Sequence, residues 1–291
     1  TKGKVKFDLY PFQEKCLTTF KDNRYNIILK ARQLGISTLS AGYSLWMMLF
    51  HNDKNILVIA TGKETAKNLV TKVRVMYEGL PQWLKTNTEE INKLSIRFAN
   101  GSQIKAIASN ESAGRSEALS LLIIDEAAFI DRIDTIWTAA QQTLSTGGGC
   151  IALSTPNGVG NWFHKQWLGA EEGTNQFNTI RLHWTDHPDR DQVWRDEQDK
   201  ILGPSQAAQE CDTDFLSSGR SVVDPAILQW YKDEMIEAPI EEVGIDRGMW
   251  VWRQPDYTKE YIVVADVARG DGSDFSACQV FEVEDMEQCA E

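Results

Sequence analysis

Cysteine and histidine are scarce in this 291-residue sequence, and their spacing excludes two kinds of site. The five cysteines are odd in number and widely scattered, and no two form a Cys-x-x-Cys pair, which argues against a disulfide framework and a zinc knuckle. His183 and His187 are four residues apart, but Pro188 follows and no His-Glu-x-x-His motif surrounds them. We therefore expect reduced thiols and no zinc site.

Long apolar runs are also missing. The longest, residues 45–50, is far shorter than the roughly 20 residues of a membrane-spanning helix. No signal segment opens the chain, and no internal repeat or low-complexity tract is present. Hydrophobic residues make up 42% and charged residues 25%, as in folded globular proteins. We expect a protein that is neither secreted nor membrane-bound.

The net charge of −12 is divided unevenly along the chain. Residues 1–120 contain 18 Lys and Arg against 10 Asp and Glu, a balance of +8, whereas residues 121–291 contain 12 against 32, a balance of −20. A polyanion would therefore be attracted to the first part of the chain.

Apolar strands alternate with helical segments after the first 25 residues, and Asn100-Gly101 is a strong hairpin signal between residues 95–99 and 103–108. This alternation predicts an α/β fold, with a mainly parallel sheet covered by helices on both faces. The predicted strands are residues 26–29, 55–60, 121–124 and 149–154, and the predicted helices are residues 37–50 and 63–77.

A second domain is expected near the end of the chain. Residues 217–221 have linker composition, and an apolar strand at residues 261–265 precedes an antiparallel partner at 276–283. We predict a first domain at 1–215, a linker or subdomain at 216–255 and the start of a second domain at 256–291. The chain opens without an initiator Met and stops shortly after a strand, so we expect a fragment.

Residues 30–38, here called the phosphate loop, follow a strand and open a helix. Gly35 and Ser37 fit the second glycine and the hydroxyl residue of the pattern GxxxxGK[ST]. Lys30 stands in place of the first glycine, and Ile36 stands in place of the lysine. Backbone N–H groups at such a helix start attract an anion, so the loop is a candidate phosphate site despite the departures.

Either of two cationic side chains could replace the missing lysine at the phosphates. Lys30 would reach the β- and γ-phosphates from the strand end on its flexible stem, or Arg32 within the loop would share or replace that task. Ser37 would offer its hydroxyl to Mg²⁺.

Two further strands end in polar residues. Asp125 and Glu126 follow an apolar strand, where the first is placed to hold hydrated Mg²⁺ and the second to orient or deprotonate the attacking water. Ser154 and Thr155 lie at the tip of another core strand, where parallel sheets bind ligands.

With these residues in hand, the chain resembles the large terminase subunit of tailed bacteriophages, the motor that packages DNA, from Tyr10 to Val283. The resemblance implies a P-loop NTPase domain followed by the first strands of an RNase H-like domain. Gln13 resembles the family's adenine-reading glutamine, and residues 32–35 resemble its Arg-Gln-x-Gly loop. Some members carry the displaced lysine seen here as Lys30.

The resemblance also assigns roles in an ATPase. Asp125 and Glu126 correspond to the Walker B carboxylate associated with Mg²⁺ and to the catalytic carboxylate, while Ser154 and Thr155 belong to the coupling segment that senses hydrolysis. The implied catalytic residues are Glu126, Arg32 and Lys30, and the residues implied to bind ATP and Mg²⁺ are Gln13, Lys30, Gly35, Ser37, Thr38 and Asp125.

Asp266 and Asp274 resemble the first acidic segment of the family's nuclease domain, which uses Mg²⁺ or Mn²⁺. The remaining acidic ligands lie further along in the family, so endonuclease activity is expected only in a complete chain. An alternative is that the segment is an ordinary hairpin, whose Gly-Asp-Gly-Ser turn is acidic only because turns favour Asp and Gly.

The resemblance implies double-stranded DNA, the portal ring and the small terminase subunit as partners, and a ring of subunits during packaging. It places the protein in the cytoplasm of the infected host cell, transiently docked on the prohead portal. No membrane partner is expected.

Two other functions stay open. A helicase-like ATPase would remodel nucleic acid without packaging it, although the coupling segment and linker argue against this. A non-catalytic scaffold with a degenerate nucleotide pocket would explain Ile36. A GTPase is disfavoured because residues 92–95 lack the aspartate of an Asn-Lys-x-Asp motif.

Overall fold

The computed structural model describes residues 6–108, 118–215, 227, 230–231, 234–244, 248–268 and 276–291. Its contacts divide the chain into two units, Thr1–Pro225 and Ala226–Glu291. Each unit is considered by itself.

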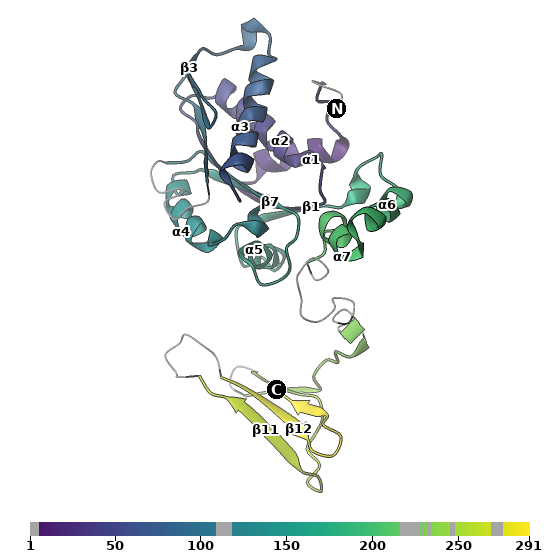
Figure 1. Ribbon diagram of the computed structural model, residues 1–291. Helices are drawn as coiled ribbons and strands as arrows, with labels where there is room; N and C mark the ends of the chain where they lie inside the picture. The colour runs from purple at the N-terminus through teal and green to yellow at the C-terminus, as the bar shows by residue number, and fades with distance from the viewer. Residues whose placement is uncertain are drawn as a thin grey trace. The chain divides into compact units, whose positions relative to one another are not determined.

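Unit 1 is built on an eight-stranded sheet with the strand order β3-β4-β5-β2-β6-β7-β1-β8 (Figure 1). The six strands from β5 to β8 in this order are parallel, and β3 and β4 form an antiparallel edge. The predicted α/β fold with a mainly parallel sheet is confirmed. The strands are β1 (Tyr25–Lys30), β2 (Asn55–Ala60), β3 (Thr88–Ile91), β4 (Ser95–Phe98), β5 (Gln103–Ala108), β6 (Leu121–Asp125), β7 (Gly149–Ser154) and β8 (Asn178–Leu182).

Helices cover both faces of this sheet. Along β1, Ile28 packs into a buried cluster with α1, α2 and α3, whereas Ile27 and Leu29 pack into a second cluster with α4 and α5 (Figure 1). This two-sided burial explains why the central strands contain near-continuous apolar runs. The helices are α1 (Pro11–Asp22), α2 (Ile36–Phe50), α3 (Lys63–Glu78), α4 (Ile133–Leu144), α5 (Trp162–Glu171), α6 (Gln192–Leu202) and α7 (Pro204–Ala207), with short 3₁₀ turns η1 (Gln82–Leu84), η2 (Ala127–Phe129) and η3 (Trp184–Asp186) and a π-helical segment η4 (Ala208–Asp212). No helix in these described ranges is long and apolar enough to cross a membrane.

The predicted hairpin joins β4 and β5 through Asn100-Gly101. Gly101 has a φ of +79°, a conformation that side chains other than glycine rarely adopt. The amide of Asn100 donates a hydrogen bond to the carbonyl of Met48 at 2.8 Å, which ties the turn to the end of α2.

Unit 2 contains a five-stranded antiparallel sheet with the order β11-β12-β13-β10-β9. The predicted pairing of β11 with β12 is present, from Tyr261 opposite Glu282 to Asp266 opposite Ala277. Residues 241–243 and 249–251, which the sequence places in the linker, belong to this sheet because β9 pairs with β10 and β10 pairs with β13. The RNase H-like assignment of this unit stays a prediction. Its strands are β9 (Glu241–Val243), β10 (Met249–Val251), β11 (Tyr261–Asp266), β12 (Ala277–Glu282) and β13 (Gln288–Ala290).

The five cysteines are free thiols, as expected, and their burial predicts an order of reactivity. Four are buried and only Cys278 is partly exposed; burial also raises the pKa of the Cys16 thiol to about 11. Because the thiolate is the reactive form, we expect Cys278 to be labelled first by a thiol reagent at pH 8. Labelling of the native chain and of a Cys278→Ser variant, read by peptide mass spectrometry, checks this. Fast labelling of Cys16 or Cys150 would contradict it.

Candidate active site

The phosphate loop connects β1 to α2 at the carboxyl end of the parallel strands. Gly35 stands just before α2 with a φ of +77°. The backbone angle favours glycine, and a Cβ at this position would lie only 2.7 Å from Nε2 of Gln13, so the Gln13 amide would have to move.

Three consecutive carbonyl groups of the loop are held by side chains from outside it. Arg190 donates from Nη1 to the carbonyl of Arg32 at 3.0 Å and from Nη2 to the carbonyl of Gln33 at 3.4 Å. Gln13 donates from Nε2 to the carbonyl of Leu34 at 2.8 Å.

The three backbone N–H groups that follow Arg32 in the loop, those of Gln33, Leu34 and Gly35, have no acceptor among the described residues. The first turn of α2 follows without a side-chain cap, and its N–H groups add to the same set of donors. Consecutive free N–H groups at a helix start form a cradle for an anion such as phosphate.

Gln13 is buried in α1 and both ends of its amide are used within the chain. Its Oε1 accepts a hydrogen bond from the backbone N–H of Tyr10 at 3.1 Å, while its Nε2 holds the phosphate loop. The Tyr10 ring stacks on Phe12 and contacts the His187 ring, with centroids 5.7 and 4.7 Å apart. The predicted adenine-reading residue therefore also fixes the loop, and aromatic rings lie beside it.

Lys30 lies opposite Glu126 across the carboxyl ends of the strands. Its Nζ is 3.0 Å from Oε1 of Glu126, and the two side chains are 6% and 32% exposed. Lys30 is the last residue of β1, Glu126 follows β6, and β7 lies between these strands. Ile36, which departs from the lysine of the usual pattern, is buried in the core. The position that normally carries the lysine therefore points into apolar packing, and Lys30 brings a cation to the site from the strand.

Ser37 and Asp125 form the second pair of the site. The Ser37 hydroxyl donates to Oδ1 of Asp125 at 3.2 Å. Burial raises the pKa of the Asp125 carboxyl, and the neighbouring Glu126 charge adds to this, while Lys30 and the Ser37 hydrogen bond oppose it. Thr38, which follows Ser37 in α2, is half-buried and makes no side-chain hydrogen bond to a described residue.

These two side chains fit a magnesium ion. Hydroxyl and carboxylate oxygens are the hard ligands that Mg²⁺ prefers, and here they already lie within reach of one another. A buried carboxylate next to a second carboxylate would also gain from a cation, because the cation favours its charged form. Mg²⁺ at nucleotide sites is usually bound by one or two side chains together with phosphate and water oxygens, so two protein ligands are sufficient.

The backbone at Glu126 is strained. Its φ of +55° and ψ of +48° place a residue with a side chain in the left-handed region, which costs about 1–3 kcal/mol and occurs preferentially at functional sites. The segment after it is held by β7: Ser154 Oγ accepts from the N–H of Ala128 at 3.1 Å, and the Asn157 amide donates to the Ala128 carbonyl at 3.1 Å. Thr155 is buried beside Ser154. The predicted coupling segment thus contacts the turn that carries Glu126.

Arg32 points away from the carboxylates. Its side chain is 66% exposed and its guanidinium pairs with the Glu210 carboxylate at 2.9 Å, while the backbone N–H of Arg32 donates to the Glu210 carbonyl at 2.7 Å. Gln209, the neighbour of Glu210 in η4, donates to the carbonyl of Pro156 at 3.2 Å. The structure therefore brings Lys30, rather than Arg32, to Glu126, and it connects η4 to both the phosphate loop and the coupling segment.

The family model described as "Terminase large subunit, T4likevirus-type, N-terminal" matches residues 27–223. The chain belongs to this family. It is also 26% identical over 168 residues to the probable terminase, large subunit gp28, of Escherichia phage Mu, which covers 53% of this chain and 30% of that protein. The resemblance to large terminase subunits is confirmed, and the matched segment spans less than a third of this curated relative.

Solved terminase structures share the fold. The large terminase ATPase domain of Thermus phage P74-26 aligns with a TM-score of 0.58 at 22% identity, covering 72% of this chain and 94% of that one. The HK97 bacteriophage large terminase aligns with a TM-score of 0.63 at 15% identity, covering 98% and 63%.

The terminase site contains charged groups that the sequence did not single out. Lys72 on α3 is partly buried, which lowers the pKa of its ammonium; the Asp125 carboxylate acts in the opposite direction and Lys30 in the same one. The sequence feature that could have indicated this lysine is its place on an amphipathic helix, next to the buried Leu69 and Val73. Arg190 had no such signal, because it reaches the loop across 158 residues of sequence.

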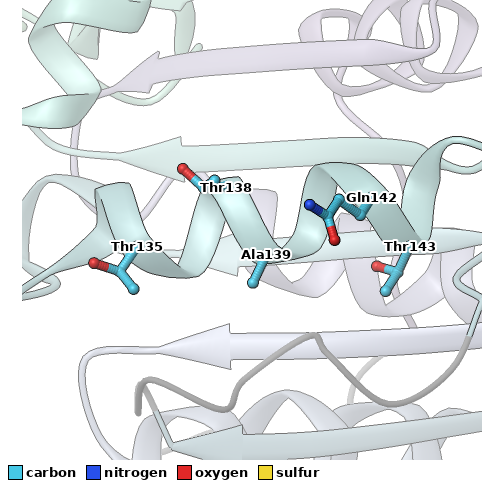
Figure 2. Close-up of a pocket in the computed structure, with 5 residues that line it drawn as sticks. All are labelled: Thr135, Thr138, Ala139, Gln142 and Thr143. Carbon is cyan, nitrogen blue, oxygen red and sulfur yellow. The ribbon is translucent and has the colours of Figure 1, made fainter.

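The terminase fold also has a cavity of about 600 Å³ on one side of α4. Figure 2 shows that its lining side chains lie along this helix. The side chains of the described lining residues are uncharged. The lining residues are Thr135, Thr138, Ala139, Gln142 and Thr143.

Proposed function

We propose that this chain is the ATP-hydrolysing motor part of a DNA-packaging terminase, which couples hydrolysis to translocation of double-stranded DNA. The observation that carries the proposal is the convergence of Lys30, Ser37, Asp125 and Glu126 beside a loop with free amides. Membership of the terminase family and the likeness to a domain named as an ATPase support it.

The phosphate loop would bind the β- and γ-phosphates through the N–H groups that follow Arg32. The Lys30 ammonium would add a positive charge at the same phosphates, and Gln13 and Tyr10 would lie at the adenine end. Mg²⁺ held by Ser37 and Asp125 would neutralise charge that develops on the phosphates.

Glu126 would act on the attacking water. Its carboxylate would orient the water and take its proton while the water oxygen bonds to the γ-phosphorus and the bond to the ADP oxygen breaks. The Lys30 ammonium is paired with the Glu126 carboxylate at 3.0 Å. Phosphates that draw the Lys30 ammonium toward themselves would release this carboxylate for the water.

Movement at Glu126 would pass to the rest of unit 1 through Ser154 and Thr155. The Ala128–Ser154 hydrogen bond joins the Glu126 turn to β7, and the Gln209–Pro156 hydrogen bond joins the segment after β7 to η4. Phosphate release would thus change the position of η4, in which Glu210 also pairs with Arg32.

The partners and location follow from the family and belong to the same proposal. They are double-stranded DNA, the portal ring and the small terminase subunit in the host cytoplasm, with several subunits in a ring. Asp266 ends β11 with an exposed side chain, and Asp274 lies outside the described residues. A nuclease centre that uses both with Mg²⁺ or Mn²⁺ would require further ligands.

The test is ATP turnover by the purified chain. We expect hydrolysis that requires Mg²⁺ and rises on addition of double-stranded DNA, with an effect that falls steeply with salt because phosphate contacts dominate non-specific DNA binding. Absence of turnover under all of these conditions would leave a scaffold as the better description. Strand separation on a forked duplex would favour the helicase-like alternative.

A further inference from the structure

We propose that Arg190 is a positioning residue of the phosphate loop, which holds two carbonyls outward and thereby turns the following amides toward the nucleotide. This inference rests on the proposed function, because it concerns how the same loop is shaped for phosphates. Arg190 lies before α6, on a segment that the sequence connects to no phosphate chemistry.

The geometry of the peptide bond supplies the first step. In a planar trans peptide, the C=O of one residue and the N–H of the next point in opposite directions. Arg190 holds the carbonyls of Arg32 and Gln33. The N–H groups of Gln33 and Leu34 are therefore turned to the opposite side, where no described group accepts from them.

The backbone of Gln33 supplies the second step. Its φ is +60°, in the left-handed region that a residue with a side chain adopts only when its surroundings hold it there. The two carbonyls that Arg190 holds lie directly before and within this residue. Without the guanidinium, Gln33 would be free to relax, and the row of amides would be lost.

Arg190 is itself held in place. Its guanidinium carbon lies 4.3 Å from the centroid of the Trp194 ring, and Trp194 packs on the buried Trp184 at 5.9 Å. A planar guanidinium can stack on this ring and donate two hydrogen bonds from fixed positions at once, which a lysine ammonium cannot reproduce.

The experiment compares Arg190→Met, Arg190→Lys and Arg181→Met in the full 291-residue chain, with ADP and Mg²⁺ as the probe. Arg181 is the matched control, because its side chain also donates to a backbone carbonyl, that of Thr213 at 2.9 Å, but makes no hydrogen bond to a carbonyl of the phosphate loop. We expect Arg190→Met to weaken ADP binding about tenfold, the scale of lost hydrogen bonds from a charged donor. Arg190→Lys should fall between Arg190→Met and the parent, and Arg181→Met should bind like the parent.

A kinetic measurement separates positioning from catalysis. Because Lys30 and Glu126 stay in place, we expect Arg190→Met to raise KM for ATP by a larger factor than it lowers kcat. ADP binding within twofold of the parent, or an equal loss in Arg181→Met, would overturn the proposal. If Arg190→Met does not fold, Arg190→Lys decides, and an unchanged affinity in it would overturn the proposal. A parent chain that binds neither ADP nor ATP would instead refute the proposed function.

Discussion

Glu126→Gln is expected to lower ATP turnover by about 10²-fold or more, the usual scale of a lost general base, while nucleotide binding survives. Glutamine keeps the shape of the side chain but cannot accept the proton of the attacking water. Glu126 is well placed for this loss to be specific, because its backbone stands in a strained conformation at a strand end beside Lys30.

Binding should survive for an electrostatic reason. In the parent chain Lys30 is paired with Glu126, and in the variant its ammonium is left for the phosphates alone. We therefore expect ADP and ATP affinities equal to those of the parent or higher.

A matched control is Glu89→Gln, which removes the same charge from the edge strand β3, where Glu89 pairs with Arg97 at 3.1 Å. Steady-state turnover and nucleotide titration of the two variants provide the comparison. Parent-like turnover in Glu126→Gln would show that another group activates the water, and an equal loss in Glu89→Gln would point to a general effect of charge.

The parallel strands of unit 1 could be predicted because their signal is local. Segments such as residues 56–60 and 121–124 are apolar throughout, since both faces of the sheet are covered. The strands β3 and β8 escaped prediction for the converse reason. All of β3 is exposed, and most of β8 is only half-buried at the sheet edge, so neither has a continuous apolar run.

The residues of the site also divide into those with a local sequence signal and those without one. Lys30, Ser37, Asp125 and Glu126 stand at the ends of recognisable elements, and topology brings strand ends together at one edge of a parallel sheet. What the sequence left open was the choice between Lys30 and Arg32, because it depends on which direction each side chain takes. Arg32 turns to Glu210, and this contact across 178 residues has no local signal. The contact of Arg190 with the phosphate loop, across 158 residues, has no local signal for the same reason.

Lys30→Met is the variant that decides between the two cations. We expect it to lower turnover by about 10²–10³-fold, the scale for removing one group that stabilises transition-state charge. Methionine retains the apolar stem of a side chain that is 6% exposed, so the fold should be kept. Glu126 would lose its partner, but at 32% exposure its carboxylate stays in contact with water. The loss should therefore appear mainly in turnover rather than in thermal stability.

Arg32→Met is the matched control, because it removes a cation two residues away that lies against Glu210 instead of Glu126. Turnover with saturating MgATP and thermal unfolding of both variants decide the matter. A large loss in Arg32→Met with parent-like turnover in Lys30→Met would transfer the role to Arg32.

Ile36→Lys places a cation at the position where the usual phosphate-loop pattern has its lysine. Ile36 is buried in the core, so a lysine there must leave apolar packing to reach the phosphates. When Ile36→Lys is combined with Lys30→Met, we expect it to restore at most a small part of the activity that Lys30→Met loses. Parent-like activity in Lys30→Met, in Arg32→Met and in the variant that combines these two substitutions would refute a phosphate-binding role for the loop altogether.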